Sequence, residues 1–122
     1  MTGQYEIAGL RIRVDSLYDE VHTLCRDYQA DGDAIDFTVK TVQSDIDFER
    51  DKSDRRDELE GNSAPPFRDG YLETLAVYRK IAEKAPFYDR ILFHGSAVAV
   101  DGEAYLFTAK SGTGIFRKRS FL

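Results

Sequence analysis

The sequence predicts an α/β fold, close to α+β in character, with an antiparallel or mixed sheet and two or three helices. Three observations indicate this class. Apolar and polar side chains alternate in residues 5–14 and 35–40, as in half-buried strands. Residues 71–84 carry apolar side chains at helical spacing. The dipeptide Asp101-Gly102 separates two short apolar runs, which is the strongest short-range signal of a β-hairpin.

Residues 1–47 are expected to run strand, helix, strand. Residues 5–14 form one strand, in which Gly9 shifts the alternation and indicates a bulge. Asp15 or Ser16 then caps a helix that Gly32 closes. Residues 35–40 form the second strand.

Residues 48–66 are a charged segment followed by a linker. Ten of the thirteen residues from 48 to 60 are charged, with both signs mixed. This composition suits an exposed helix with weak ion pairs, such as Asp51 with Arg55, and equally suits a mobile segment. Residues 62–66 contain two prolines and break the pattern. The next helix, residues 71–84, is expected to end before Pro86 and to pack on the sheet through Leu75, Tyr78 and Ile81.

The composition limits the class of protein. A chain of 122 residues is expected to form a single domain. The 22 acidic residues exceed the 17 basic ones, which argues against nucleic-acid and anionic-membrane partners, since both need clustered Lys and Arg. One cysteine, Cys25, allows no internal disulfide and fits a reducing compartment. Without an apolar run of about 20 residues or a signal-peptide pattern, the expected location is cytoplasmic.

The most informative segment is residues 91–114, expected to read strand, turn, strand and Gly-rich loop. The loop is Ser111-Gly112-Thr113-Gly114, preceded by Lys110. Glycines let successive backbone N–H groups converge on an anion, so Lys110 to Gly114 form a candidate phosphate-binding site. A working loop continues with Lys and a hydroxyl residue, and this chain has Ile115 and Phe116 instead.

In its order and spacing, this segment resembles the HPr kinase/phosphorylase and ATP-dependent phosphoenolpyruvate carboxykinase-like group. The resemblance rests on His94-Gly95, Asp101-Gly102, residues 105–107 and residues 111–114, and it departs at Ala109, Ile115 and Phe116. Residues 5–14 and 71–90 resemble, more distantly, the lead-in of bacterial members. The resemblance implies the front part of a phosphoenolpyruvate carboxykinase-like kinase fold. It also implies ATP and Mg²⁺ as ligands, a serine or small molecule as phosphoryl acceptor, and His94 as an accessory residue.

The expected function is that of a truncated or degenerate member of this group, without catalytic turnover. Neither ATP nor Mg²⁺ is expected to bind tightly, and no catalytic or metal-binding residue is assigned. The tail, residues 115–122, lacks the pattern of the helix that normally follows a phosphate loop. The alternative is a non-enzymatic oligomerising or interaction module.

A homo-oligomer is expected in either case. It would be held through the strand edge at residues 105–107 or through residues 116–122 of the tail. His22 and Cys25 are interpreted as structural residues, and the alternating acidic residues 45–51 as a solvated face rather than a calcium loop.

Overall fold

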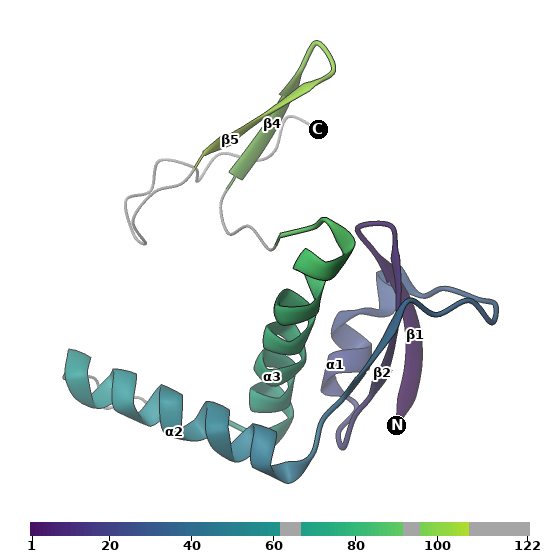
Figure 1. Ribbon diagram of the computed structural model, residues 1–122. Coiled ribbons are helices and arrows are strands. Elements are labelled where there is room, and N and C mark those ends of the chain that lie inside the picture. Colours follow the sequence, from purple (N-terminus) through teal and green to yellow (C-terminus); the bar gives the residue numbers. More distant parts are fainter. Residues whose placement is uncertain (62–66, 92–95, 108–122) are drawn as a thin grey trace. The chain divides into compact units, whose positions relative to one another are not determined.

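The computed structural model describes residues 1–61, 67–91 and 96–107, in two compact units, Met1–Arg90 and Ile91–Leu122. The first unit contains three strands, three α-helices and two 3₁₀-helices among its described residues (Figure 1). They are β1 (Thr2–Ile7), β2 (Leu10–Asp15), α1 (Glu20–Leu24), η1 (Arg26–Tyr28), β3 (Phe37–Lys40), α2 (Gln43–Glu60), α3 (Asp69–Lys84) and η2 (Ala85–Tyr88). The second unit contains β4 (Ser96–Val100) and β5 (Glu103–Phe107). The predicted mixture of sheet and helices is confirmed, and the prediction of a single domain stays a prediction.

The first two strands form a hairpin. β1 pairs antiparallel with β2, from Thr2 opposite Asp15 to Ile7 opposite Leu10. Ala8 and Gly9 connect them with φ values of 54° and 77°, and two positive φ angles define a type I′ turn. The prediction of one bulged strand over residues 5–14 is therefore wrong. Alanine rarely adopts positive φ, so Ala8-Gly9 carries only half of the usual turn signal.

The predicted helix after β2 is much shorter than expected. Residues 17–19 are a bend, α1 has five residues, and η1 follows it. Ser16 Oγ donates to the Tyr18 carbonyl at 2.6 Å, and the Leu17 and Tyr18 amides donate to Glu73 of α3. Because these bonds hold residues 16–18 outside a helix, neither Asp15 nor Ser16 caps one.

The third strand makes the sheet mixed. β3 runs parallel to β2, from Phe37 beside Ile12 to Lys40 beside Asp15, and the strand order is β1-β2-β3. The strand predicted at residues 35–40 is thus confirmed from Phe37 onward. Parallel neighbours need a crossover connection, here the segment containing α1 and η1.

Both edges of this sheet carry additional hydrogen bonds. At the β1 edge, the Ala30 amide donates to the Gln4 carbonyl at 3.0 Å. At the β3 edge, Tyr88 Oη donates to the Asp36 carbonyl at 2.8 Å and Lys80 Nζ to the Lys40 carbonyl at 3.1 Å. Side chains that occupy edge carbonyls reduce the capacity of the strand to pair with another chain.

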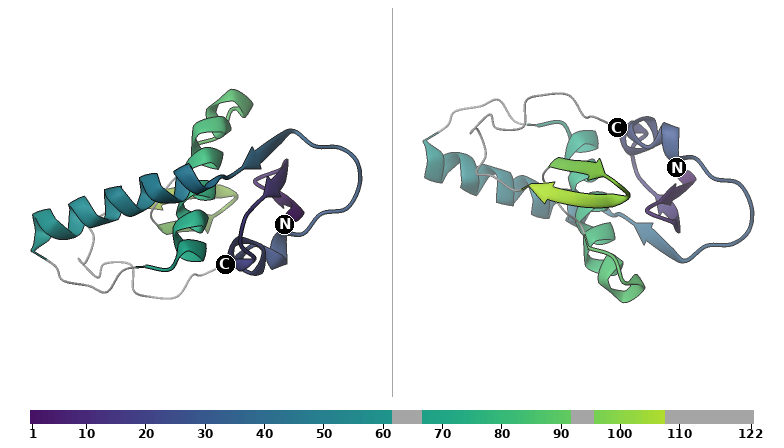
Figure 2. Two further views of the ribbon diagram at one scale, coloured as in Figure 1. Left: turned by 90° about the horizontal axis from the view of Figure 1, so that it is seen from below. Right: turned by 90° about the horizontal axis from the view of Figure 1, so that it is seen from above.

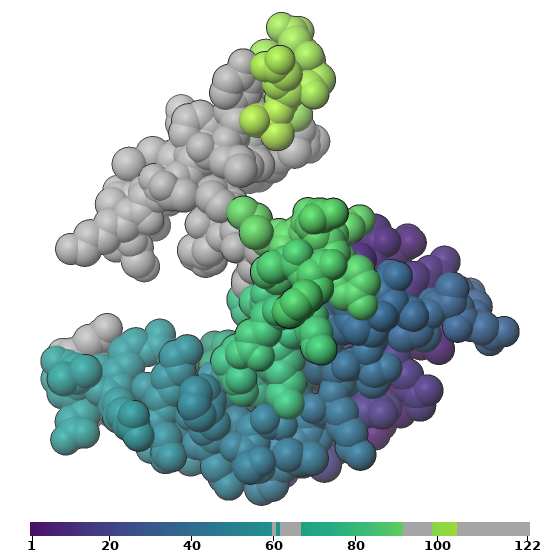
Figure 3. All heavy atoms as spheres, viewed as in Figure 1, coloured from purple at the N-terminus to yellow at the C-terminus, as the bar shows by residue number. Residues whose placement is uncertain are grey.

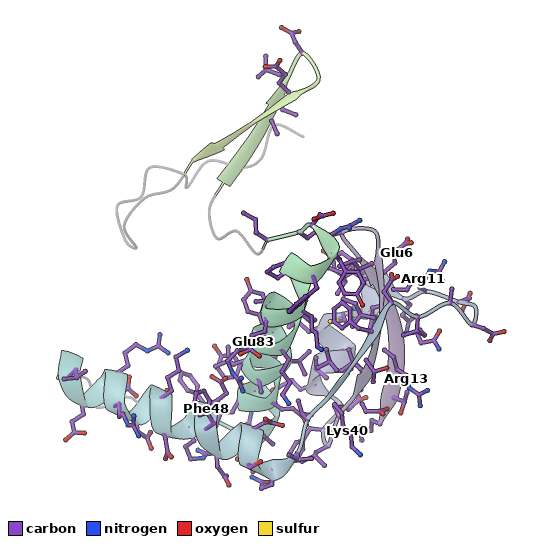
Figure 4. The ribbon with its side chains drawn as sticks, in the orientation of Figure 1. Glu6, Arg11, Arg13, Lys40, Phe48 and Glu83 are labelled. Carbon is purple, nitrogen blue, oxygen red and sulfur yellow. The ribbon has the colours of Figure 1, made fainter. Side chains whose placement is uncertain are left out.

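The hydrophobic core lies on one face of the sheet. α1 and α3 cover this face, and Val21 and Val77 are their buried contributions. The strands supply Tyr5, Leu10, Ile12, Val14, Phe37 and Val39. The opposite face is polar and carries the cross-strand pair Glu6–Arg11, with 3.8 Å between Arg11 Nε and Glu6 Oε1 (Figure 4).

The charged segment is a long helix. α2 begins at Gln43, where Asp45 Oδ2 accepts the Val42 amide at 2.9 Å, and it ends at Glu60, directly before Gly61, which has φ of 70°. The sequence left two alternatives for this segment, an exposed helix and a mobile segment, and the structure shows a helix through Glu60. Its first half packs against α3 and buries Ile46, and its second half extends past α3 (Figure 2).

The helix predicted at residues 71–84 is confirmed, but its predicted packing face is wrong in part. α3 buries Leu72, Glu73, Ala76 and Val77, and Ile81 packs at the margin of the core. Leu75 is half-buried and Tyr78 is 50% exposed. The helix is apolar on two opposite faces, and the face that contains Glu73 is the one turned inward. Pro86 lies in η2, directly after the end of α3.

The second unit confirms the Asp-Gly hairpin. β4 and β5 pair antiparallel from Ser96 opposite Phe107 to Val100 opposite Glu103. Asp101 and Gly102 have φ values of 52° and 80°, which is again a type I′ turn. Within the described ranges, no helix is both long and apolar enough to cross a membrane.

Candidate functional site

The sequence-predicted phosphate site lies outside the described residues. This applies to Lys110, Ser111, Gly112, Thr113 and Gly114 and also to His94. The described β4–β5 hairpin nevertheless shows where the two segments that contain these residues begin. Ser96 and Phe107 are cross-strand partners, so the chain enters and leaves the hairpin at the same end. His94 precedes Ser96 by two residues, and Lys110 follows Phe107 by three.

In the first unit, a histidine lies within hydrogen-bond distance of both a tyrosine and a serine. His22 Nδ1 is 2.6 Å from Tyr5 Oη, and His22 Nε2 is 2.8 Å from Ser16 Oγ and 3.2 Å from the Met1 carbonyl. The directions of these bonds decide what the group does. A carbonyl only accepts, so Nε2 carries the hydrogen, and in the neutral ring Nδ1 then accepts from Tyr5.

These bond directions assign the serine–histidine pair to structure. Burial, together with Cys25 and Asp19, raises the pKa of Tyr5, which keeps its hydroxyl protonated as the donor. Ser16 Oγ gives its hydrogen to the Tyr18 carbonyl. A nucleophilic serine must instead give its hydrogen to the histidine. The structural interpretation of His22 agrees with these contacts. Its partners come from β1 and from the residue after β2, and no local pattern in the sequence indicates them.

Among the described residues, the most buried charged group is Glu73 of α3, whose exposed fraction is 0%. Its Oε2 accepts the Leu17 amide at 2.7 Å and Thr41 Oγ1 at 2.6 Å, and its Oε1 accepts the Tyr18 amide at 2.9 Å. Three donors satisfy a carboxylate that would otherwise be costly to bury. Glu73 therefore joins α3 to both chain segments that leave the sheet, after β2 and after β3. In the sequence, the one indication of this role is that Glu73 is an acidic residue inside an apolar helical run.

A network of charges joins α2 to α3. Arg79 Nε donates to Glu49 at 2.8 Å and its Nη1 to Glu83 at 3.2 Å, and its guanidinium lies 4.7 Å from the centre of the Phe48 ring. Lys80 Nζ is 3.2 Å from Asp45. The hydrogen bond to Glu49 is the main cause that raises the pKa of Arg79. Figure 4 shows Phe48 on α2 and Glu83 on α3.

This network uses the alternating acidic residues of α2 for helix packing. Asp45 and Glu49 hold Arg79 and Lys80. In the part of the chain that the structure describes, no three His, Cys, Asp or Glu side chains form a group that could hold a metal ion.

The remaining candidate is a surface on α3 opposite its buried face. We call it the outer face of α3 and define it as Tyr71, Leu75, Tyr78 and Ala82. The spacing of four, three and four residues places them in one row along the helix. Tyr71 is 39% and Tyr78 50% exposed, while Leu75 and Ala82 are half-buried. None of the four is charged, although 32% of the whole chain is. Figure 3 shows α3 at the surface of the first unit.

Comparison of the chain with models of protein families, with curated proteins and with solved structures finds no match. Two features of the described residues bear on function: the β4–β5 hairpin, which leads into the Gly-rich segment, and the outer face of α3.

Proposed function

We propose that this chain is a degenerate member of the HPr kinase/phosphorylase and phosphoenolpyruvate carboxykinase-like group, which binds a phosphate-bearing ligand without transferring the phosphoryl group. One observation carries the proposal. The paired ends of the β4–β5 hairpin start both motif segments, His94-Gly95 and residues 109–114, from neighbouring backbone positions. A strand that leads directly into a Gly-rich run is the arrangement in which backbone N–H groups gather around an anion.

The chemistry of the loop separates binding from catalysis. Phosphoryl transfer requires cations that neutralise the charge developing on the transferred group. Ile115 and Phe116 supply neither a cation nor a magnesium ligand, which leaves Lys110 as the basic side chain of the loop. Backbone N–H groups alone bind phosphate weakly. The proposed ligands are ATP and Mg²⁺–ATP, and the family's phosphoryl acceptor would go unmodified.

Fold and location form part of the same proposal. We propose that the two units are the front part of a phosphoenolpyruvate carboxykinase-like kinase fold. We also propose a cytoplasmic location, which the single cysteine supports.

Calorimetric titration of the whole chain with ATP, ADP and inorganic phosphate tests this proposal. We expect weak binding of ATP, with Kd of about 0.1–1 mM, and no release of phosphate from ATP. Lys110→Ala and the double variant Gly112→Val/Gly114→Val are expected to abolish binding. Lys52→Ala, on exposed α2, is the control for non-specific attraction and should bind ATP like the unmodified chain.

Two results would contradict the proposal. One is the absence of any ATP or phosphate binding by the unmodified chain at millimolar ligand. The other is hydrolysis of ATP that persists in the glycine double variant, which would place a working site elsewhere.

A second candidate function is a non-enzymatic oligomerising module. The outer face of α3 favours it, because an uncharged row with two exposed tyrosines is typical of a surface that binds another protein. Sedimentation equilibrium of the whole chain tests it. Self-association at micromolar concentration is the expected result, and a monomer at all accessible concentrations would contradict it.

A further inference from the structure

The dipeptide Asp31-Gly32 lies in the irregular segment between η1 and β3, and both of its residues are exposed. Asp-Gly is the dipeptide in which an aspartate side chain most readily reacts with the backbone, because glycine has no Cβ to hinder the approach to its nitrogen. Within the described residues, no hydrogen bond or ion pair holds the Asp31 carboxylate or the Gly32 amide. Neither reacting group is therefore held away from the other.

The sequence contains two other Asp-Gly dipeptides, and the structure restrains both. Asp69-Gly70 begins α3, where Arg50 and Tyr18 bind the aspartate side chain. Asp101-Gly102 forms the type I′ turn between the paired strands of the second unit, with φ values of 52° and 80°. Reaction requires the side-chain carboxyl to lie against the next backbone nitrogen, so regular hydrogen-bonded backbone slows it. The structure thus distinguishes Asp31-Gly32 from the other two.

A guanidinium group is bonded to the main-chain carbonyl of the same dipeptide. Arg11 lies on β2 (Figure 4), and its Nη1 donates to the Asp31 carbonyl oxygen. That carbonyl is conjugated with the Gly32 nitrogen. A positive charge beside its oxygen therefore stabilises the negative charge that develops when the nitrogen gives up its proton. Arg11 thus favours attack of the Gly32 nitrogen on the Asp31 side chain.

We propose that Asp31-Gly32 is a modification site at which aspartate isomerises to isoaspartate with the assistance of Arg11. The Gly32 nitrogen forms a bond to Asp31 Cγ and loses its proton, and one carboxyl oxygen leaves as water. Water then adds to the cyclic imide that results. Addition at Cγ restores aspartate. Addition at the main-chain carbonyl carbon breaks its bond to the nitrogen and leaves that carbon as a free carboxylate, which is isoaspartate.

The position of Arg11 also selects the product. The main-chain oxygen that Arg11 binds becomes an oxygen of the free carboxylate in isoaspartate. The guanidinium polarises that carbonyl toward water and then pairs with the carboxylate that forms. Isoaspartate is therefore favoured over aspartate more strongly in the folded chain than in the unfolded one. The proposal is independent of phosphate binding and of self-association.

Incubation of the whole chain in heavy-oxygen water at neutral pH tests the site. Hydrolysis of the imide places one heavy oxygen in the residue, whichever product forms. Trypsin then releases the three dipeptides on separate peptides, residues 27–40, 69–79 and 91–110, and fragmentation in the mass spectrometer locates the label. We expect Asp31 of the native chain to gain label at least about tenfold faster than Asp69 and Asp101. In the chain unfolded with guanidinium chloride, all three should gain label at similar rates.

Substitution of Arg11 tests the assistance. Arg11→Gln should slow labelling of Asp31 in the native chain at least about threefold. It should also lower the ratio of isoaspartate to aspartate, measured by chromatography of peptide 27–40, to that of the unfolded chain. Arg13→Gln is the matched control, because it removes the same charge from the same strand, and it should change neither quantity. Circular dichroism of each variant verifies that the fold is retained.

The outcomes test the site and the role of Arg11 separately. Labelling of Asp31 in the native chain that is no faster than labelling of Asp69 overturns the site. Equal ratios of isoaspartate to aspartate in the native and unfolded chains overturn the selection of the product, and this comparison needs no variant. A labelling rate that Arg11→Gln leaves unchanged, or that Arg13→Gln lowers equally, overturns the assistance by Arg11.

Discussion

Replacing Glu73 with alanine is expected to destabilise the first unit by about 4.5–6 kcal/mol. The side chain is fully buried and accepts three hydrogen bonds, from the amides of Leu17 and Tyr18 and from Thr41 Oγ1. Hydrogen bonds to a charged group contribute about 1.5–3 kcal/mol each when buried. The two amide bonds are only partly buried, so water can partly replace the carboxylate there, and we take the lower end of the range for each.

Urea unfolding followed by circular dichroism measures this loss. Glu83→Ala is the matched control, because it removes a carboxylate from the same helix where the side chain is 63% exposed. That variant should lose less than about 0.5 kcal/mol. Thr41→Val removes one donor and is expected to cost about 1.5–3 kcal/mol. Most of that cost should disappear when the same substitution is made in the Glu73→Ala variant. If Glu73→Ala lost no more stability than Glu83→Ala, Glu73 would not be the link between α3 and the two segments that leave the sheet.

Two further predictions concern acid stability and the first turn. Although burial alone would raise the pKa of Asp45, the Val42 amide, Lys80 and Arg79 together hold it below the ordinary 3.8. A lowered pKa in the folded state stabilises the fold above pH 3.8, and this contribution is lost as the pH falls through the folded-state pKa. Asp45→Asn should therefore lower the free energy of unfolding by about 1 kcal/mol at pH 7. It should also make the free energy of unfolding depend less on pH below pH 4, as measured by urea unfolding at several pH values. An unchanged pH dependence would contradict this reasoning. Ala8→Asn should stabilise the fold by about 0.5–1 kcal/mol in the same assay, because asparagine tolerates the φ of 54° at this turn position; destabilisation would show that another contact of Ala8 matters more.

The elements that the sequence predicted well are those with strong local signals. Asp101-Gly102 gives a type I′ turn because both residues tolerate positive φ, and the neighbouring strands follow from it. α3 follows from its helical spacing, and β3 from its alternation. In each case the signal lies within a few residues of the element and needs no distant partner.

The elements that the sequence missed depend on distant partners or on an atypical residue. The bend at residues 17–19 replaces the first turn of a predicted helix because Glu73, more than fifty residues away, binds two of its amides. Ala8 adopts a left-handed conformation that alanine seldom takes, so the first hairpin looked like one strand. The contacts among Tyr5, Ser16 and His22 likewise join three separate elements. The candidate phosphate residues lie outside the described ranges, and for them the sequence remains the only guide.

The packing of α3 shows why hydrophobic pattern alone selected a face that is wrong in part, at Leu75 and Tyr78 but not at Ile81. Judged by apolar residues, the row with Tyr71, Leu75 and Tyr78 is the better candidate for the core, because the opposite row contains Glu73. The inward row is nevertheless favoured, since Glu73 meets three donors that no apolar side chain could satisfy. An apolar row is left outside as a consequence. A helix that is apolar on two opposite faces is typical of one covered on both sides.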